Sequence, residues 1–165
     1  MELYYQQISS PVGALVIAAS ESSLFGLVYA CHWAHFAKKA FSLKHQPNPL
    51  LTRCQDQLTE YFEGTRCEFD LPYQLNGSPF QRQAWEALAE IPYGETVSYK
   101  QQASAINAPN AVRAVGRANG LNPLCIILPC HRVVGSNGSL TGYAGGLAAK
   151  QLLLKLEQAS GYCKQ

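Results

Sequence analysis

The chain has 165 residues, 47% of them hydrophobic and 15% charged, which fits one or two small folded domains and excludes a disordered chain. No stretch approaches the roughly 18 consecutive apolar residues of a membrane span, and the N-terminus lacks the basic start and apolar run of a signal peptide, so we expect a cytoplasmic protein without membrane contacts. Residues 1–95 carry a net charge of −4 and residues 96–165 a net charge of +6, so the second part favours a polyanion partner, unless the basic surface arises by chance or serves solubility.

The first part of the chain alternates between strand and helix patterns. Short apolar runs separated by turn residues predict three strands, and apolar residues at helical spacing predict two helices, the first of which ends before the Pro-rich segment 45–49. The predicted elements are strands at Leu3–Ile8, Gly13–Ala19 and Leu24–Ala30, helices at Trp33–Leu43 and Leu51–Phe62, and a short strand at Cys67–Leu71.

The second part is mostly helical. Ser78 is a good N-cap and Pro79 fits the first helical position, so a helix begins there and runs to Ile91. Two short helices follow, separated by the break Asn107-Ala108-Pro109, which is the layout of a helix-turn-helix that meets DNA with its second helix. We predict helices at Ser98–Ile106, Asn110–Asn119 and Leu147–Gln158, a buried strand at Ile126–Leu128, a turn at Asn137-Gly138 and a loop at Gly142–Gly146.

Cys130 is the candidate nucleophile. Pro129 ends the predicted strand, so the next side chain is expected to emerge exposed at the end of the sheet. The adjacent His131 and Arg132 favour the thiolate, which is the reactive form of cysteine, and His131 is a candidate base. Glu157, the sole carboxylate after residue 95, either is solvated or orients the histidine. The alternative for Cys130 itself is a buried structural thiol.

The other cysteines give weaker signals. In a cytoplasmic protein, six cysteines are expected to be free thiols rather than a disulfide framework. Cys31, His32 and His35 offer three ligands for a metal, but their spacing matches no common zinc pattern and no fourth ligand is evident. We therefore predict no metal site.

Several motifs in the second part together carry a family resemblance. Pro129-Cys130-His131-Arg132-Val133 resembles the acceptor motif of the O6-alkylguanine-DNA alkyltransferases, the methylated-DNA–protein-cysteine methyltransferases. The resemblance covers residues 78–158, with a looser match at Ser10–Gly13. The supporting motifs, in family order, are Phe80-Gln81, Trp85, Ile91–Gly94, Ser98-Tyr99, Arg113–Gly116, Asn122-Pro123, Gly142–Gly146 and Lys150 through Glu157.

The resemblance implies an α+β fold, in which a small mixed α/β, ribonuclease H-like domain (1–76) precedes a mostly helical, winged-helix-like helix-turn-helix domain (77–165). It implies irreversible, stoichiometric transfer of the alkyl group from O6-alkylguanine, and from O4-alkylthymine, in double-stranded DNA to Cys130 after nucleotide flipping. It implies neither cofactor nor zinc, because Ser20 and Phe25 stand where some members carry zinc ligands. We expect a monomer that joins the nucleoid when bound to DNA.

The resemblance also assigns roles to residues. Cys130 would accept the alkyl group, and His131 would act through a water with Glu157 behind it. Asn122 would hold the local turn and Tyr99 would donate a hydrogen bond to the base. The residues assigned to DNA binding are Arg113, Tyr99, Ala114, Arg117, Ala118 and Asn119. Those assigned to the base pocket are Val133, Tyr143, Ala144 and Gly145. Asn119 replaces a larger apolar residue of some relatives, which leaves the range of accepted alkyl groups open.

Three other functions fit parts of the pattern. A damage-binding relative without repair activity would lack the cysteine of this motif. A Cys-His hydrolase would turn over and needs an oxyanion hole. A helix-turn-helix regulator would bind a particular DNA sequence and keep its role after Cys130→Ala.

Overall fold

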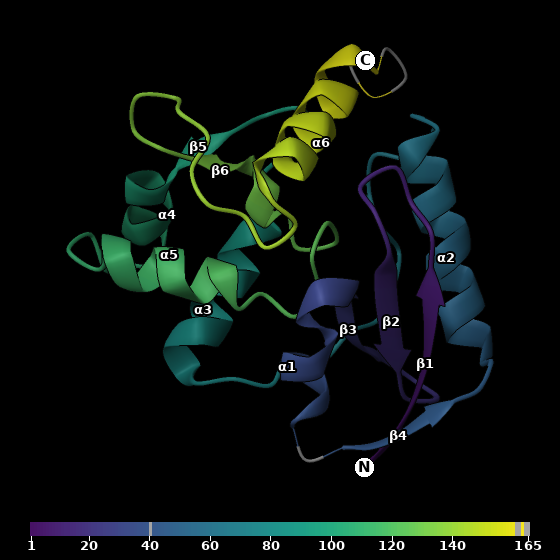
Figure 1. Ribbon diagram of the computed structural model, residues 1–165. Helices are drawn as coiled ribbons and strands as arrows, with labels where there is room; N and C mark the ends of the chain where they lie inside the picture. The colour runs from purple at the N-terminus through teal and green to yellow at the C-terminus, as the bar shows by residue number, and fades with distance from the viewer. Residues whose placement is uncertain (40, 161–162, 164–165) are drawn as a thin grey trace.

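The structure is a computed structural model that describes residues 1–39, 41–160 and 163. Its N-terminal part is a four-stranded sheet in the order β3-β2-β1-β4 (Figure 1). β1 pairs antiparallel with β2 and parallel with β4, and β2 pairs antiparallel with β3. The strands are β1 (Glu2–Ile8), β2 (Leu15–Ala19), β3 (Leu24–Tyr29) and β4 (Ser42–His45).

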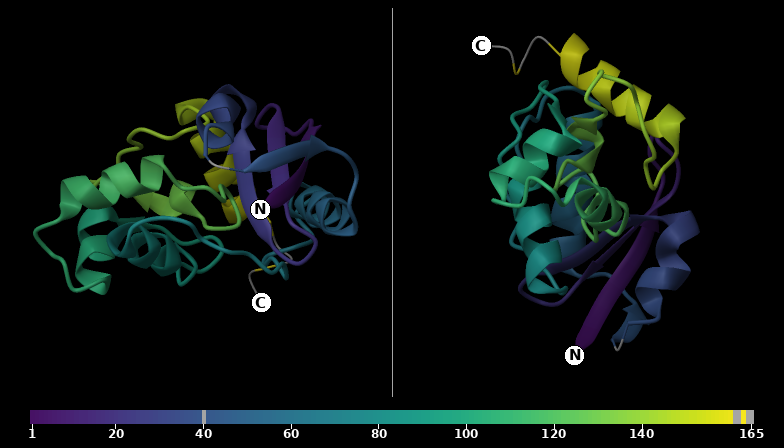
Figure 2. Two further views of the ribbon diagram at one scale, coloured as in Figure 1. Left: turned by 90° about the horizontal axis from the view of Figure 1, so that it is seen from below. Right: turned by 90° about the vertical axis from the view of Figure 1, so that its left-hand side faces the viewer.

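Helices cover both faces of this sheet (Figure 2). Alternate residues of a strand point to opposite faces, and the two faces accordingly belong to two apolar clusters. Leu15, Ile17 and Leu27 lie in the larger cluster with α2 (Pro49–Phe62), whereas Val16 and Val28 lie in the smaller one with Phe36. Phe36 comes from α1 (Trp33–Ala37), which follows the 3-10 turn η1 (Ala30–His32).

The C-terminal part is a helical cluster with one small sheet. Ser78 and Ser98 each form a capping box with the Gln three residues later, which fixes the starts of α3 and α4. Trp85 Nε1 donates to the Ala118 carbonyl at 2.7 Å and joins α3 to α5. The elements are α3 (Pro79–Leu88), β5 (Val97–Ser98), α4 (Tyr99–Ala105), α5 (Val112–Gly120), η2 (Cys130–Arg132), β6 (Val133–Val134) and α6 (Leu147–Ala159).

The predicted α+β class is confirmed, with a mixed α/β part followed by a mostly helical one. The larger apolar cluster is continuous between the two parts, because Leu15 and Leu58 share it with Trp85 and Leu153. The division between residues 76 and 77 stays a prediction, and residues 161, 162, 164 and 165 of the second predicted domain lie outside the described ones. No helix in the described part of the chain is both long and apolar enough to cross a lipid bilayer.

Two long-range features contradict the sequence prediction. The helix predicted at Trp33–Leu43, whose residue 40 is not described, ends at Ala37, and Ser42–His45 instead pairs with β1. A sheet edge far away in sequence therefore overrides the local helical pattern. Cys67 and Cys163 form a disulfide with Cα atoms 5.8 Å apart, so the expectation of six free thiols is wrong for this pair. Cys163 follows α6, which brings it to the loop after α2.

Two predicted strands are also absent from the described residues. At Cys67–Leu71 side chains take over the hydrogen bonding of a strand, because Gln57 accepts from the Asp70 N–H and donates to its carbonyl. At Ile126–Leu128 the chain turns, because Ile126 adopts a left-handed φ of 74°. The short apolar run marks a buried turn, which apolar character alone does not distinguish from a strand.

We predict that Asn48→Ala destabilises the protein by about 0.5–2 kcal/mol. The Asn48 side-chain oxygen accepts from the N–H groups of Leu50 (2.8 Å) and Leu51 (3.0 Å) and so caps α2. Serine is an equally good cap, so Asn48→Ser should restore most of the loss, measured by urea unfolding. Equal losses for both variants would show that the 3.0 Å bond from the Asn48 amide to the Ser20 carbonyl matters more than the cap.

Candidate active site

Cys130 lies at the start of η2, directly after Pro129. Its backbone N–H donates to the Leu128 carbonyl at 2.8 Å, which tightens the turn. The residue is 5% exposed, so the expectation of an exposed thiol at a strand end is wrong. The reason is the buried turn before it, which directs Cys130 inward to the wall of a cavity of about 220 Å³. The other lining residues are Tyr99, Gly116, Asn119, Gly120, Gly142, Tyr143 and Ala144.

The surroundings of Cys130 favour its ionised form. A hydrogen bond from the Cys125 thiol is the largest influence and lowers the pKa of Cys130, against burial, which raises it. The Asn122 amide and the Lys150 charge lower the pKa further, so the net shift is downward. The sequence prediction credited His131 and Arg132 with this effect, but the Arg132 guanidinium is engaged elsewhere, with Glu157.

Asn122 fixes the turn that precedes Cys130. Its amide donates to the Leu128 carbonyl at 2.8 Å, and its side-chain oxygen accepts from the Leu124 N–H at 3.0 Å. Both bonds are buried, where an unmade hydrogen bond is costly. Asn122 therefore braces the backbone on which Cys130 sits.

Lys150 connects β6 with the side of the cavity that Tyr99 lines. It is fully buried, and its ammonium donates to the carbonyls of Val133 (2.6 Å) and Thr141 (3.1 Å). The Thr141 hydroxyl in turn donates to the Tyr99 hydroxyl at 3.0 Å. Burial lowers the pKa of Lys150, while the nearby Cys130 raises it. Lys150 thus ties the Tyr99 side of the cavity to β6.

Glu157 is a buried carboxylate at the meeting point of four segments. Its oxygens accept from Tyr61 of α2 (2.6 Å), from the Gly94 N–H (3.2 Å) and from Arg132 (2.8 and 3.0 Å). The fifth contact joins it to His131 Nε2 at 2.7 Å. Burial alone would raise the pKa of Glu157, but the bonds and charges of His131 and Arg132 together lower it to about 2. Of the two readings open from sequence, the oriented carboxylate agrees with this geometry.

His131 is fully buried and neutral at pH 7, because burial lowers its pKa more than Glu157 raises it. An ionised carboxylate can only accept, so Nε2 carries the proton in the bond to Glu157. Nδ1 is then a free acceptor, and it has no hydrogen-bond partner among the described residues. Nδ1 is therefore the ring atom that can accept a proton.

The predicted DNA-contacting residues divide into two groups. Arg113, Ala114 and Arg117 are exposed on α5 and line a shallow pocket beside Phe80. Ala118 and Asn119 are buried, and the Asn119 amide exchanges hydrogen bonds with Gln102 at 2.9 and 2.7 Å. The side chain of Asn119 is thereby committed to holding α4 against α5, although the residue still borders the cavity.

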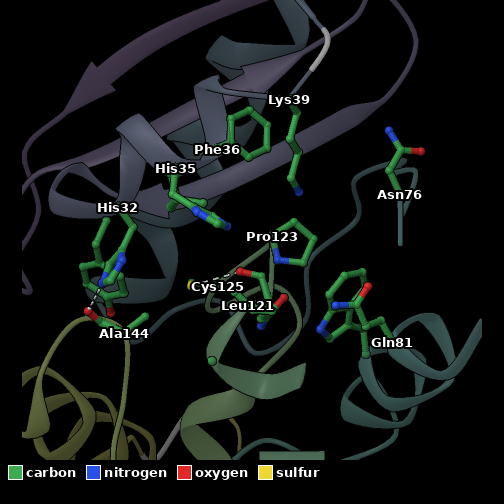
Figure 3. Close-up of a pocket in the computed structure, with 15 residues that line it drawn as sticks. His32, His35, Phe36, Lys39, Asn76, Gln81, Leu121, Pro123, Cys125 and Ala144 are labelled. Atoms are coloured by element: carbon green, nitrogen blue, oxygen red, sulfur yellow. Dashed lines mark hydrogen bonds between the residues drawn. The ribbon is translucent and has the colours of Figure 1, made fainter. Parts of the chain in front are cut away.

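The predicted base-pocket residues are near one another, but not equally placed. Tyr143 and Ala144 line the cavity beside Cys130, whereas Gly145 packs against the Tyr29 ring. Val133 is fully buried and contributes its carbonyl to Lys150. A second cavity of about 410 Å³ is also lined by Ala144, and Cys130 is not among its lining residues (Figure 3).

The sequence prediction gives no site role to Cys125, Lys150 and Tyr61, and it connects Arg132 with the thiol rather than with Glu157. Cys125 and Lys150 act on the thiol, and Tyr61 and Arg132 hold Glu157. The absence of any other carboxylate after residue 95 is a usable signal for Arg132, since a buried arginine needs an acidic partner. Nothing in the sequence connects Tyr61 with Glu157. His32, one of the residues weighed as metal ligands, bonds through Nε2 to the Ala144 carbonyl at 2.8 Å.

Comparisons with known proteins cover nearly the whole chain. Residues 3–75 match the ribonuclease-like domain of 6-O-methylguanine DNA methyltransferase, and residues 79–159 match the DNA binding domain of the same family. The chain is 43% identical over 159 residues to the constitutive methylated-DNA–protein-cysteine methyltransferase of Bacillus subtilis, covering 95% of this chain and 96% of that one. It is 44% identical over 156 residues to the methylated-DNA–protein-cysteine methyltransferase of Methanosarcina barkeri, covering 94% and 98%. The crystal structure of Mycobacterium tuberculosis OGT in complex with DNA superposes with a TM-score of 0.85 at 43% identity, covering 95% and 94%.

We predict that Glu157→Gln destabilises the protein at pH 7 by about 3–5 kcal/mol, because Arg132 is left buried without a counter-charge. Glu157 has a folded-state pKa of about 2, below its ordinary value of 4.5. Its contribution is therefore present above pH 4.5 and is lost as pH falls towards 2. The difference between wild type and variant should shrink over that window in urea unfolding.

The matched control is Glu21→Gln, at an exposed glutamate in the turn between β2 and β3. Its free energy of unfolding should stay within about 0.5 kcal/mol of wild type at every pH. A Glu157→Gln effect that did not change between pH 7 and pH 2 would contradict the pKa assigned to this carboxylate.

Proposed function

Because the chain belongs to the 6-O-methylguanine DNA methyltransferase family and is a methylated-DNA–protein-cysteine methyltransferase, which repairs O6-methylguanine in DNA, we propose that Cys130 is the cysteine that takes the methyl group. The observation that carries this proposal is the position of Cys130 in the wall of a cavity of about 220 Å³ with a lowered thiol pKa. The remaining free thiols on the described chain are the exposed Cys31 and the buried Cys54 and Cys125, and burial raises the pKa of Cys54 to about 12.

The proposed reaction is an in-line displacement. The Cys130 thiolate forms a bond to the saturated methyl carbon, the bond from that carbon to O6 breaks, and its electron pair stays on the guanine. A thiolate is a strong nucleophile for such a carbon. The product is a thioether, which has no carbonyl for water to attack, so each molecule acts once. No external methyl donor or cofactor takes part.

His131 and Glu157 would prepare the nucleophile. The free Nδ1 of His131 is an acceptor, and a bridging water would carry the Cys130 proton to it. The imidazolium formed in this way gains a charge-assisted bond to Glu157, 2.7 Å from Nε2. The low pKa of Glu157 keeps its carboxylate charged for that purpose.

Tyr99 would serve the leaving group. Its hydroxyl lies at the cavity that Cys130 lines and accepts a hydrogen bond from Thr141, so its own proton is free to be donated. Donation to the departing guanine stabilises the charge that develops on the base. Tyr143 and Ala144 would enclose the base in this cavity, and Gly145 and the backbone of Val133 would support them from behind.

Double-stranded DNA carrying O6-alkylguanine is the proposed partner, and a relative in the family has been crystallised in complex with DNA. The exposed Arg113, Ala114 and Arg117 of α5 would face the duplex, with Ala118, Asn119 and Tyr99 behind them. The alkylated base must leave the stack to reach a buried sulfur, which costs a few kcal/mol. We propose that Arg113 fills the space it leaves. Action on O4-alkylthymine, the monomeric state, the division of the chain at residue 76 and the cytoplasmic, nucleoid-associated location stay predictions.

We predict that Cys130→Ala abolishes methyl transfer while DNA binding remains within about twofold of wild type, since the change removes one buried sulfur atom and leaves the exposed residues of α5 in place. Wild type and variant are incubated with duplex DNA containing O6-methylguanine labelled in its methyl group, and the labelled peptide is located. Cys31→Ala, at an exposed thiol, is the matched control and should transfer normally.

Label on any residue other than Cys130 would refute the assignment, and repeated turnover would favour a hydrolase-like reaction. If wild type bound the damaged duplex without taking up label, it would be a damage-binding protein instead. Sequence-specific binding that is indifferent to the lesion would indicate a helix-turn-helix regulator.

Arg113→Ala should slow repair of duplex DNA about tenfold and leave transfer from free O6-methylguanine base nearly unchanged, because only the duplex requires flipping. The two single-turnover rates are compared for wild type, Arg113→Ala and Lys38→Ala. Lys38 is an exposed cation just after α1 and controls for the loss of one positive charge. Equal losses on duplex and free base would argue against the flipping role of Arg113.

A further inference from the structure

The segment 142–146 contributes to the walls of two cavities. Tyr143 and Ala144 line the cavity of about 220 Å³ beside Cys130. Ala144 also lines the cavity of about 410 Å³ between the two parts of the chain, where His32 and Pro123 are seen in Figure 3. The contacts that hold this wall therefore affect the shape of the cavity beside Cys130.

Tyr29, the last residue of β3, is the first of these contacts. Its hydroxyl is hydrogen-bonded to the Tyr143 hydroxyl at 2.9 Å, and the two rings meet edge to face with centroids 5.6 Å apart. A Cβ atom at Gly145 would overlap the Tyr29 ring, so the backbone of the wall rests directly on it. Tyr29 is 4% exposed and its backbone pairs with Leu15 in the sheet, which makes it a rigid support.

His32, three residues further along, is the second contact. Its Nε2 lies 2.8 Å from the Ala144 carbonyl, which can only accept, so the ring donates this bond (Figure 3). His32 ends η1, whose first residue is bonded through its N–H to the Ala14 carbonyl of the sheet region. The wall is thus fastened at two adjacent residues to the same edge of the N-terminal part.

We propose that Tyr29 and His32 are positioning residues, by which the N-terminal part of the chain sets the width of the cavity that receives the alkylated base. The proposal rests on the proposed function of Cys130 and its cavity. Neither residue lines the cavity beside Cys130, so they act through Tyr143 and Ala144 rather than on the substrate. Loss of either contact lets the wall move towards the larger cavity and loosens the fit around the base.

The test separates binding of the base from chemistry. Tyr29→Phe keeps the ring under Gly145 and removes only the hydroxyl. We expect the concentration of free O6-methylguanine base that gives half-maximal transfer to rise about two- to tenfold, as for the loss of one buried hydrogen bond. The maximal rate should stay within about twofold. The pH of half-maximal alkylation of Cys130 by iodoacetamide should not shift, because Cys125, Asn122 and Lys150 set that ionisation.

Three further sets of variants distinguish positioning from general stability. Tyr73→Phe is the matched control, since Tyr73 packs against the same apolar cluster at the other end of β3. In a double-mutant cycle, Tyr29→Phe should have no further effect in the Tyr143→Phe background, because the hydroxyl acts through its partner. His32→Ala should also weaken base binding, and His32→Gln, which retains an N–H donor, should restore it.

The proposal is overturned if Tyr29→Phe behaves like Tyr73→Phe, if its effect persists unchanged in the Tyr143→Phe background, or if only the maximal rate falls. The location of the label in wild type is established first. Wild type that takes no label at Cys130 refutes the proposed function and this inference with it. Wild type labelled at Cys130, with Tyr29→Phe unaltered, refutes the inference alone.

Discussion

A charge buried in a protein interior has to be matched, and the carboxylate of Glu157 organises the whole site for this reason. Its partners come from α2, from the loop at Gly94 and from η2, while Glu157 itself belongs to α6. Loss of any one partner would leave a buried charge or hydrogen-bonding group of this cluster without its match. The segments that contribute them are therefore held in one arrangement, and η2, which contains two of the partners, begins with Cys130.

At Cys130 the site favours a charge that burial alone would disfavour. Burial disfavours a thiolate and raises the pKa of Cys54, and at Cys125 the hydrogen bond with Cys130 and then burial raise the pKa. At Cys130 the neighbouring Cys125, Asn122 and Lys150 reverse that outcome. Two thiols five positions apart, equally out of reach of solvent, are thus given different ionisation. The reactive sulfur is enclosed yet ionisable, a combination suited to a base that enters a cavity rather than to reagents in solution.

The sequence was sufficient for local features and insufficient for long-range ones. The cap at Ser78, the helix start near Ser98 and the helix break near Asn107 are contiguous signals, and each predicted its element correctly, whereas the apolar run before Cys130 did not. The strand β4 depends on the free edge of β1, and the Cys67–Cys163 disulfide on where α6 ends, so neither is encoded nearby. Tyr61 and Glu157 are 96 residues apart, and only the packed fold joins them.

Single use changes what such a site needs. An enzyme that turns over must restore its nucleophile after each reaction. A protein that ends as a thioether needs no such step, so its sulfur can be buried in a cavity wall behind a braced turn, provided that the base can enter and leave. The N-terminal part of the chain contributes to this rigid site at two points. The Tyr61 hydroxyl binds Glu157 of α6, and the Tyr29 ring supports the wall at Gly145. This support around the site favours one correct encounter, after which the repaired base leaves and the sulfur does not have to be restored.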